Sequence, residues 1–138
     1  MSCKSALYAA MQTPTAVAVD GVIPLGSLIR RYGCDLSLNG NAVNIIGGNQ
    51  SASYYDVDAS VTVAPAAVGT VTITLFKDGV AVPGATASAT AAAANDALDL
   101  NITALVRQVC CAVGSALTLV LTGAAATVNN VALRVQRI

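Results

Sequence analysis

Residues 54–84 read YYDVDASVTVAPAAVGTVTITLFKDGVAVPG and alternate apolar with polar side chains through two successive segments. A strand sends successive side chains to opposite faces, so a period of two predicts strands with one buried face. The expected buried positions are Tyr55, Val57, Ala59, Val61 and Val63 in the first segment, and Val71, Ile73 and Leu75 in the second. The dipeptide Asp78-Gly79 then supplies the positive φ angles of a tight hairpin. The stretch therefore predicts an antiparallel sheet packed on a core.

The same period continues along most of the chain. Asn39-Gly40 divides LSLNGNAVNI into a hairpin, and further alternating segments are ALDLNITALVR, SALTLVLTG and NNVALRVQRI. SALYAAM and TAVAV predict two short early strands, and ATASATAAAAND predicts a strand that runs into a loop at Asn95-Asp96. About nine or ten short strands without a convincing helix indicate an all-β jelly-roll sandwich, formed as a single domain over residues 1–138.

The charge content is low and balanced. Charged residues make up 10% of the chain and hydrophobic ones 55%, with seven basic and seven acidic side chains. Ordinary soluble domains carry about 25% charged residues, so we expect an oligomer that covers part of this surface. The basic residues form no cluster beyond Arg30-Arg31, which argues against a nucleic-acid partner. The alternation interrupts every apolar run before it reaches the ~18 residues of a membrane span, so no membrane insertion is expected.

The four cysteines are Cys3, Cys34, Cys110 and Cys111. They lack the C-x₂-C spacing of a zinc site, and the chain contains no histidine, so a metal site is not favoured. The first residues lack the sustained apolar segment of a secretory signal, which predicts assembly in the cytoplasm, where thiols normally stay reduced. The favoured interpretation is that they are small apolar residues, with a disulfide or a reactive thiol as the alternatives.

Catalysis is not expected. A serine or cysteine nucleophile needs a nearby base, most often histidine, and glycosidases need a positioned carboxylate pair. Asp78 is explained by its hairpin, and most other aspartates fall at turns or on polar strand faces. The sequence predicts a non-enzymatic protein without a cofactor.

Asp56 and Asp58 share one face of the first strand, a spacing that could place both carboxylates on a Ca²⁺ ion. Asp35 could join them if the fold brings it close. The simpler interpretation is a solvated strand face, because no calcium-binding loop accompanies the pair. Asp56 and Asp58 are therefore weak metal candidates.

Arg30-Arg31-Tyr32 is a second candidate site. The arginines could bind an acidic sugar or a carboxylate partner, with Tyr32 as a stacking platform. The simpler alternative is that they form ion pairs with aspartates across a subunit boundary. Tyr54 is a further candidate for glycan contact, because it begins the polar face of the first long strand.

Three stretches carry a resemblance to a known family. SALYAAM and TAVAV, YYDVDASVTVAP followed by GTVTITLFKDGVAVPGATAS, and LTLVLTGAAATVNNVALRVQRI resemble, in that order, the short bacterial and phage members of the C1q/TNF-like jelly rolls. Such domains are found at the ends of collagen-like spore-surface proteins and on virions. The resemblance covers most of the chain and implies a homotrimer. The chain departs from the family in two ways: no Gly-X-Y stalk precedes the domain, and its aromatic content of 4% is low for the aromatic-rich trimer core of that family.

The leading hypothesis is a structural protein: a trimeric bacteriophage capsid decoration or fibre head, located on the virion and contacting another capsid or fibre protein. Its expected free loops are residues 47–53 and 109–115. One alternative is a carbohydrate- or receptor-binding module that binds surface glycans through three weak sites. Another is an assembly protein of a bacterial or spore surface.

Overall fold

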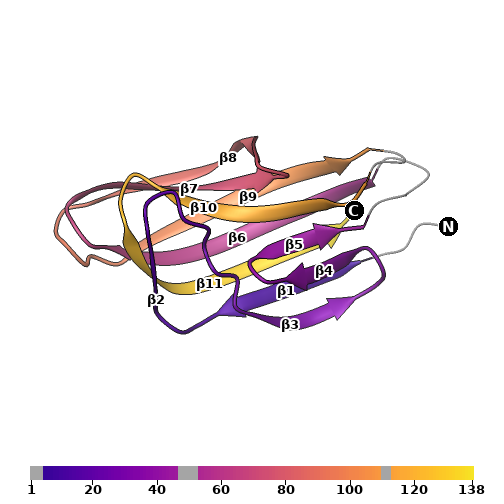
Figure 1. The fold of residues 1–138 in the computed structure, drawn as a ribbon, viewed down its shortest axis with the longest axis horizontal. Helices are drawn as coiled ribbons and strands as arrows, with labels where there is room; N and C mark the ends of the chain where they lie inside the picture. Colours follow the sequence, from indigo (N-terminus) through magenta and orange to yellow (C-terminus); the bar gives the residue numbers. More distant parts are fainter. Residues whose placement is uncertain (1–4, 47–52, 110–112) are drawn as a thin grey trace.

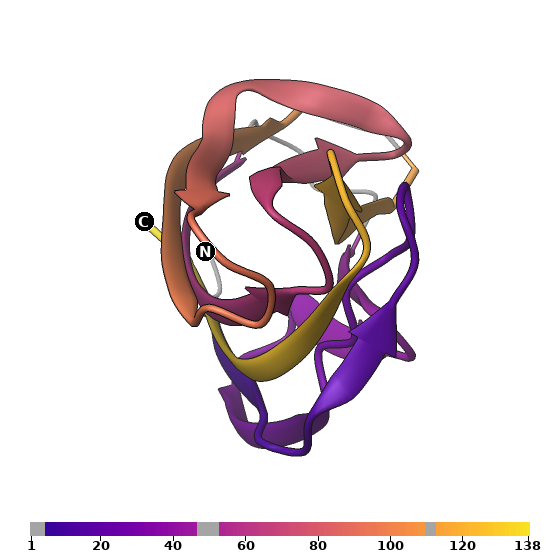
Figure 2. The same cartoon turned by 90° about the vertical axis from the view of Figure 1, so that its left-hand side faces the viewer.

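The computed structural model describes residues 5–46, 53–109 and 113–138. Within these ranges the chain forms eleven β-strands arranged in two antiparallel sheets (Figure 1). The described residues include no helix that is long and apolar enough to cross a membrane. An end-on view shows the strands wrapped around a common interior (Figure 2).

The first sheet, called here the β6 sheet, has the strand order β3-β1-β11-β6-β9, and the short β2 also pairs with β11. Its long central strands β11 and β6 pair with each other along nearly their whole length. The strand bounds are β1 Ala6–Met11, β2 Thr15–Val17, β3 Ser27–Tyr32, β6 Ser53–Pro65, β9 Leu98–Gln108 and β11 Ala126–Arg137.

The second sheet, called here the β7 sheet, has the order β4-β5-β10-β7-β8. Along one side of the sandwich, β8 of this sheet contacts β9 of the β6 sheet, although the two strands belong to different sheets. The bounds are β4 Leu36–Asn39, β5 Ala42–Ile45, β7 Gly69–Lys77, β8 Val80–Ala91 and β10 Ser115–Thr122.

The core lies between the two sheets and follows the predicted alternation. All eight positions expected to be buried in residues 54–84 are buried, at an exposure of 4% or less. The facing strands contribute Leu117, Leu119 and Leu121 from β10, and Val131, Leu133 and Val135 from β11. Burying a side chain of this size contributes about 1.5–3 kcal/mol, so the inward faces supply the main drive to fold.

The predicted hairpins are confirmed. Asp78 and Gly79 have φ angles of 52° and 81° and connect β7 to β8, and Gly40, with φ of 61°, lies in the turn between β4 and β5. One strand was not expected. Ser27–Tyr32 forms β3, an edge strand whose six residues are all exposed, which raises the number of strands in the described residues above the nine or ten predicted.

Candidate functional site

The outer face of the β6 sheet carries a continuous cross-strand row of polar side chains. The pairing registers join one residue from each of the five main strands: Arg30, Tyr8, Arg134, Asp58 and Thr103. Residues directly opposite on neighbouring antiparallel strands lie on the same face, and their side chains contact each other. The row therefore brings together side chains that lie far apart in the chain.

Within this row Asp58 accepts two bonds. Arg134 forms an ion pair with its Oδ2 through Nη2, and the Thr103 hydroxyl donates to its Oδ1 at 3.1 Å. The side chains of Arg134 and Asp58 are 53% and 35% exposed, and exposed pairs of this kind contribute only about 0–1 kcal/mol. Their effect is to hold a defined pattern of charge on the face.

Beside this row the face is hollowed. The next row contains Ala132, Ser60 and Asn101, whose short side chains line a depression of about 430 Å³. Tyr8 and Arg134 form part of its wall. A shallow depression with an aromatic and an arginine at its rim is the type of surface that protein partners cover, since both residue types are enriched at interfaces.

The side of the sandwich where β8 meets β9 is different. Here a hollow of about 230 Å³ is lined mainly by apolar side chains, including Val80 and Leu105, which are 70% and 57% exposed. Lys77 and Arg107 also line it, and none of its lining residues is acidic. This edge is therefore apolar with a positive rim.

The outer face of the β7 sheet presents hydroxyls along β7 and β8. Three cross-strand pairs bond to each other: Thr70 with Thr90 at 2.9 Å, Thr72 with Ser88 at 2.7 Å, and Thr74 with Thr86 at 3.3 Å. These hydroxyls partly satisfy one another, and cross-strand Thr pairs stabilise a sheet by themselves. This ladder therefore does not require a partner.

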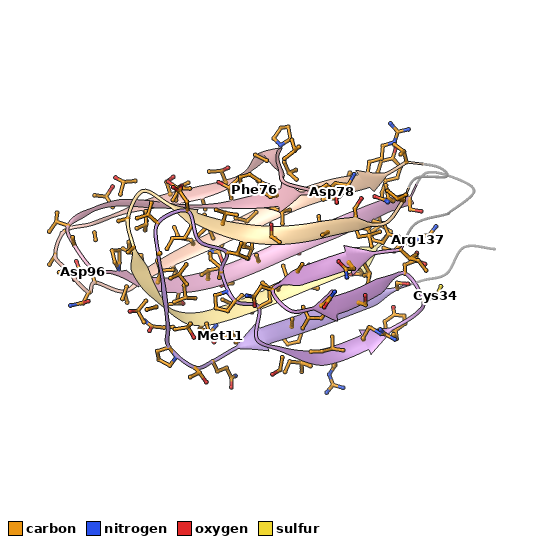
Figure 3. The ribbon with its side chains drawn as sticks, in the orientation of Figure 1. Met11, Cys34, Phe76, Asp78, Asp96 and Arg137 are labelled. Atoms are coloured by element: carbon orange, nitrogen blue, oxygen red, sulfur yellow. The ribbon has the colours of Figure 1, made fainter. Side chains whose placement is uncertain are left out.

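A buried polar cluster closes one end of the sandwich, where Figure 3 shows Arg137 and Cys34. The Asp35 carboxylate is ion-paired with Arg137, and it accepts a hydrogen bond of 3.0 Å from the Tyr55 hydroxyl. The Ser5 hydroxyl accepts bonds from the backbone N–H groups of Cys34 and Asp35 at 3.2 and 3.0 Å. Burial, and then the bond to the Asp35 carboxylate, raise the pKa of Tyr55 to about 12. The cluster thus fastens β11, β6 and the β3–β4 connection together.

Comparison with known proteins rests on structure alone, because no protein-family model and no curated protein matches the chain. Murine APRIL at pH 5.0 superposes with a TM-score of 0.69 and 12% identity over 96% of this chain and 98% of that one. The PRD1 vertex protein P5 superposes with a TM-score of 0.65 and 14% identity, over 100% of this chain and 99% of that one. The globular domain of zebrafish complement 1qA protein superposes with a TM-score of 0.57 and 7% identity, over 96% of this chain and 94% of that one. This chain has the C1q/TNF-like jelly-roll fold.

On this C1q/TNF-like sandwich the candidate binding residues do not form one site. Arg30 lies opposite Tyr8 on the outer face, whereas Arg31 lies opposite Leu7, whose side chain points to the core. Tyr32 shares the outer side with Arg30. Tyr54 lies on the outer face of β6, opposite Arg107 and far across the sheet from β3. The three residues of this candidate therefore do not converge on one side of β3, because Arg31 points away from Arg30 and Tyr32.

The aspartates also separate. Asp56 and Asp58 share the outer face of β6, as expected, but Asp58 is paired with Arg134. Asp35 bonds to Tyr55, whose side chain points to the opposite face, so the fold does not meet the condition under which Asp35 could join the pair. In the described ranges no three His, Cys, Asp or Glu side chains gather as metal ligands would.

The cysteine interpretation needs a correction at Cys34, which is disulfide-bonded and so is not a plain apolar thiol. Cys3, Cys110 and Cys111 lie outside the described residues, as do residues 47–52 and 110–112 of the two loops expected to be free. Ser53 and Ser115, taken as ends of these loops, are buried residues at the ends of β6 and β10.

Sequence reasoning missed the two arginines of β11 and Tyr8. The alternation of the last strand could have placed Arg134 on the face opposite Leu133 and Val135, so a signal for this residue was present. Nothing in the sequence pointed to the pairing of Asp35 with Arg137, which are 102 positions apart.

Proposed function

We propose that this chain is a non-enzymatic structural protein that assembles as a homotrimer and is displayed on a bacteriophage virion, as a capsid decoration or fibre head. The observation that carries the proposal is the presence of two different surfaces on one C1q/TNF-like sandwich: the depression on the outer face of the β6 sheet and the apolar edge where β8 meets β9. Low overall charge, 10% of the residues, also favours burial between copies.

A closed ring of three copies needs two different surfaces on each copy, because the contact around a threefold axis is heterologous. The depression offers a hollow of about 430 Å³ with Tyr8 at its wall, and the edge offers exposed apolar side chains such as Val80 and Leu105. Packing the β8–β9 edge of one protomer against the depression on the β6 sheet of the next would cover both surfaces.

The outer face of the β6 sheet carries acids and arginines together, so the proposed contact depends on burial of apolar side chains and not on opposite charge. Asp56, Asp58 and Asp99 share this face with Arg30, Arg107 and Arg134.

The virion location is supported by the likeness to a vertex protein of the phage PRD1, matched over the full length of this chain. In such a setting the partner would be another capsid or fibre protein of the same particle. The lack of histidine in the sequence supports a role in assembly instead of acid–base catalysis.

Light scattering coupled to size-exclusion chromatography tests the trimer. At micromolar concentration we expect three times the chain mass of 13.7 kDa. Ala132→Arg, which fills the depression, should give monomers, whereas Thr118→Arg, on the outer face of the β7 sheet, should remain trimeric. A monomeric wild-type protein, or trimers lost in Thr118→Arg but retained in Ala132→Arg, would contradict the proposal.

The virion location needs a separate measurement. Purified particles of the phage that encodes this chain should contain it, detected by mass spectrometry and placed by cryo-electron microscopy at an external position. Finding the chain only in the lysate, and never in purified particles, would remove the virion part of the proposal and leave the trimer standing.

A further inference from the structure

A third hollow, which the trimer proposal does not use, lies where the β3–β4 connection meets β5. Its volume is about 290 Å³, at the lower end for small-molecule pockets, so it suits a ligand of about one sugar ring. It is lined by Arg31, Cys34, Asp35, Leu36, Ser37, Asn44 and Ile46. All of these residues belong to one chain, so the hollow does not depend on a partner subunit.

The charge at this hollow is positive. The Asp35 carboxylate is neutralised by Arg137, which pairs with it from the core side. Arg31 has no ion-pair partner among the described residues, where only the Asp35 and Asp58 carboxylates are paired. A guanidinium left without a counter-ion beside a hollow favours an anionic group, and its planar donors match a carboxylate.

The rest of the lining suits hydroxyl groups on a ring. Ser37 and Asn44 lie directly opposite each other on β4 and β5, and within the described part of the chain neither side chain makes a hydrogen bond. Together they offer donors and acceptors to neighbouring hydroxyls. Ile46, which is exposed, adds apolar surface against which the C–H groups of a sugar can pack.

We propose that this hollow binds an acidic monosaccharide, with the sugar carboxylate on Arg31 and its hydroxyls on Ser37 and Asn44. A bare anion would leave the polar groups of the two strands unused, and a neutral sugar would leave Arg31 unpaired. The site goes beyond the structural role proposed above, and three copies of it on a trimer would bind a glycan-coated surface with increased avidity.

Saturation-transfer NMR and calorimetry on the purified full chain test the site with defined probes. These are the methyl glycosides of glucuronic, galacturonic and N-acetylneuraminic acid, with methyl glucoside and acetate as comparisons. We expect at least one acidic glycoside to bind about tenfold or more tightly than both comparisons, because charge-assisted bonds to Arg31 add to hydroxyl contacts.

The matched variants are Arg31→Gln and Arg30→Gln, which remove the same charge from neighbouring residues on opposite sides of β3. Arg31→Gln should weaken binding of the acidic glycoside about 10- to 100-fold and leave the neutral one unchanged, whereas Arg30→Gln should bind like the wild type. Asn44→Ala should weaken the acidic glycoside without changing acetate. Because both arginines are exposed, the variants should fold, which thermal melting checks.

Three results would overturn the inference. They are no saturation transfer with any of the three acidic glycosides, equal binding of acetate or methyl glucoside, and equal losses in Arg30→Gln and Arg31→Gln. A wild-type protein that is monomeric in light scattering leaves this test intact, since one chain forms the whole hollow. The failure of the trimer and the failure of the sugar site are therefore distinguishable.

Discussion

The last strand supplies two arginines that each pair with an aspartate, one in the interior and one on the surface. Arg137 and Asp35 have side chains that are 11% and 3% exposed, whereas Arg134 and Asp58 are 53% and 35% exposed. Replacing each arginine by glutamine makes the same chemical change at both places. The comparison therefore isolates the effect of burial on an ion pair.

We expect Arg137→Gln to lower the free energy of unfolding by about 3–5 kcal/mol. The reason is that the variant leaves the Asp35 carboxylate buried with the Tyr55 hydroxyl as its remaining side-chain donor from the cluster. In the single chain Arg134→Gln should cost about 0–1 kcal/mol, because water solvates both groups of that pair there. Against a total stability of about 5–15 kcal/mol, the first change is large and the second is close to the error of the measurement.

Urea denaturation followed by circular dichroism at pH 7 measures both effects. All variants must be compared at one protein concentration at which the wild type is monomeric, because Arg134 lies at the proposed trimer contact and assembly into oligomers adds to apparent stability. Adding Asp35→Asn completes a double-mutant cycle. The double variant should lose less than the sum of the two single losses, since Asp35→Asn removes the buried charge that Arg137→Gln alone would leave unpaired.

Equal losses in Arg137→Gln and Arg134→Gln would refute this reasoning, because burial would then make no difference to the pair. Additive losses in the double-mutant cycle would also refute it, since they would show that Asp35 and Arg137 act independently. A lower midpoint with an unchanged denaturant slope is the expected form of the result, because the folded state keeps its buried surface.

Three further variants test the backbone and the buried tyrosine. Gly26→Ala should destabilise the fold by about 3 kcal/mol or more, because Gly26 has φ of 75° and an added Cβ would lie 2.3 Å from the Ala10 carbonyl oxygen. Gly40 has a similar φ of 61°, but an added Cβ would meet no atom within 4 Å, so Gly40→Ala should lower the free energy of unfolding by only about 1–2 kcal/mol. Equal melting temperatures for the two variants would contradict the steric argument. Because the pKa of Tyr55 is raised to about 12 in the folded protein, its contribution to stability is complete below pH 10 and is lost as pH rises toward 12. Urea midpoints measured from pH 9 to 12 should fall more steeply for the wild type than for Tyr55→Phe, and parallel curves would show that Tyr55 is not the group responsible.

The fold could be predicted where apolar and polar residues differ sharply along a strand. In β6 the inward positions are apolar and the outward ones are mostly polar, so the period of two is visible without any knowledge of neighbours. The strand β3 lacks this contrast, because Ser27–Tyr32 is exposed at every position. Residues 27–32 form a strand because they pair with the free edge of β1, and this edge exists only once the sheet has formed.

The candidate site could be predicted only in part, because it depends on register between strands that are distant in sequence. The polar face of β6 was expected to carry Asp58, but its neighbours Arg134 and Thr103 follow from the pairing of β6 with β11 and β9. A shift of one residue in either pairing would place them on the core side. Alternation gives the face of each residue, whereas register decides which residues meet.

Arg30 and Arg31 show both effects, since alternation sets the side of β3 on which each lies and register sets the residue that each one meets. A single ligand site formed by Arg30, Arg31 and Tyr32 would require the two arginine side chains to converge. As part of a strand they must point to opposite sides, and the register places Arg30 beside Tyr8 and Arg31 opposite Leu7. The first then belongs to the proposed trimer face and the second to the hollow near Ser37 and Asn44. A neutral substitution at each arginine should therefore affect a different property of the protein, with assembly sensitive to Arg30 and sugar binding sensitive to Arg31.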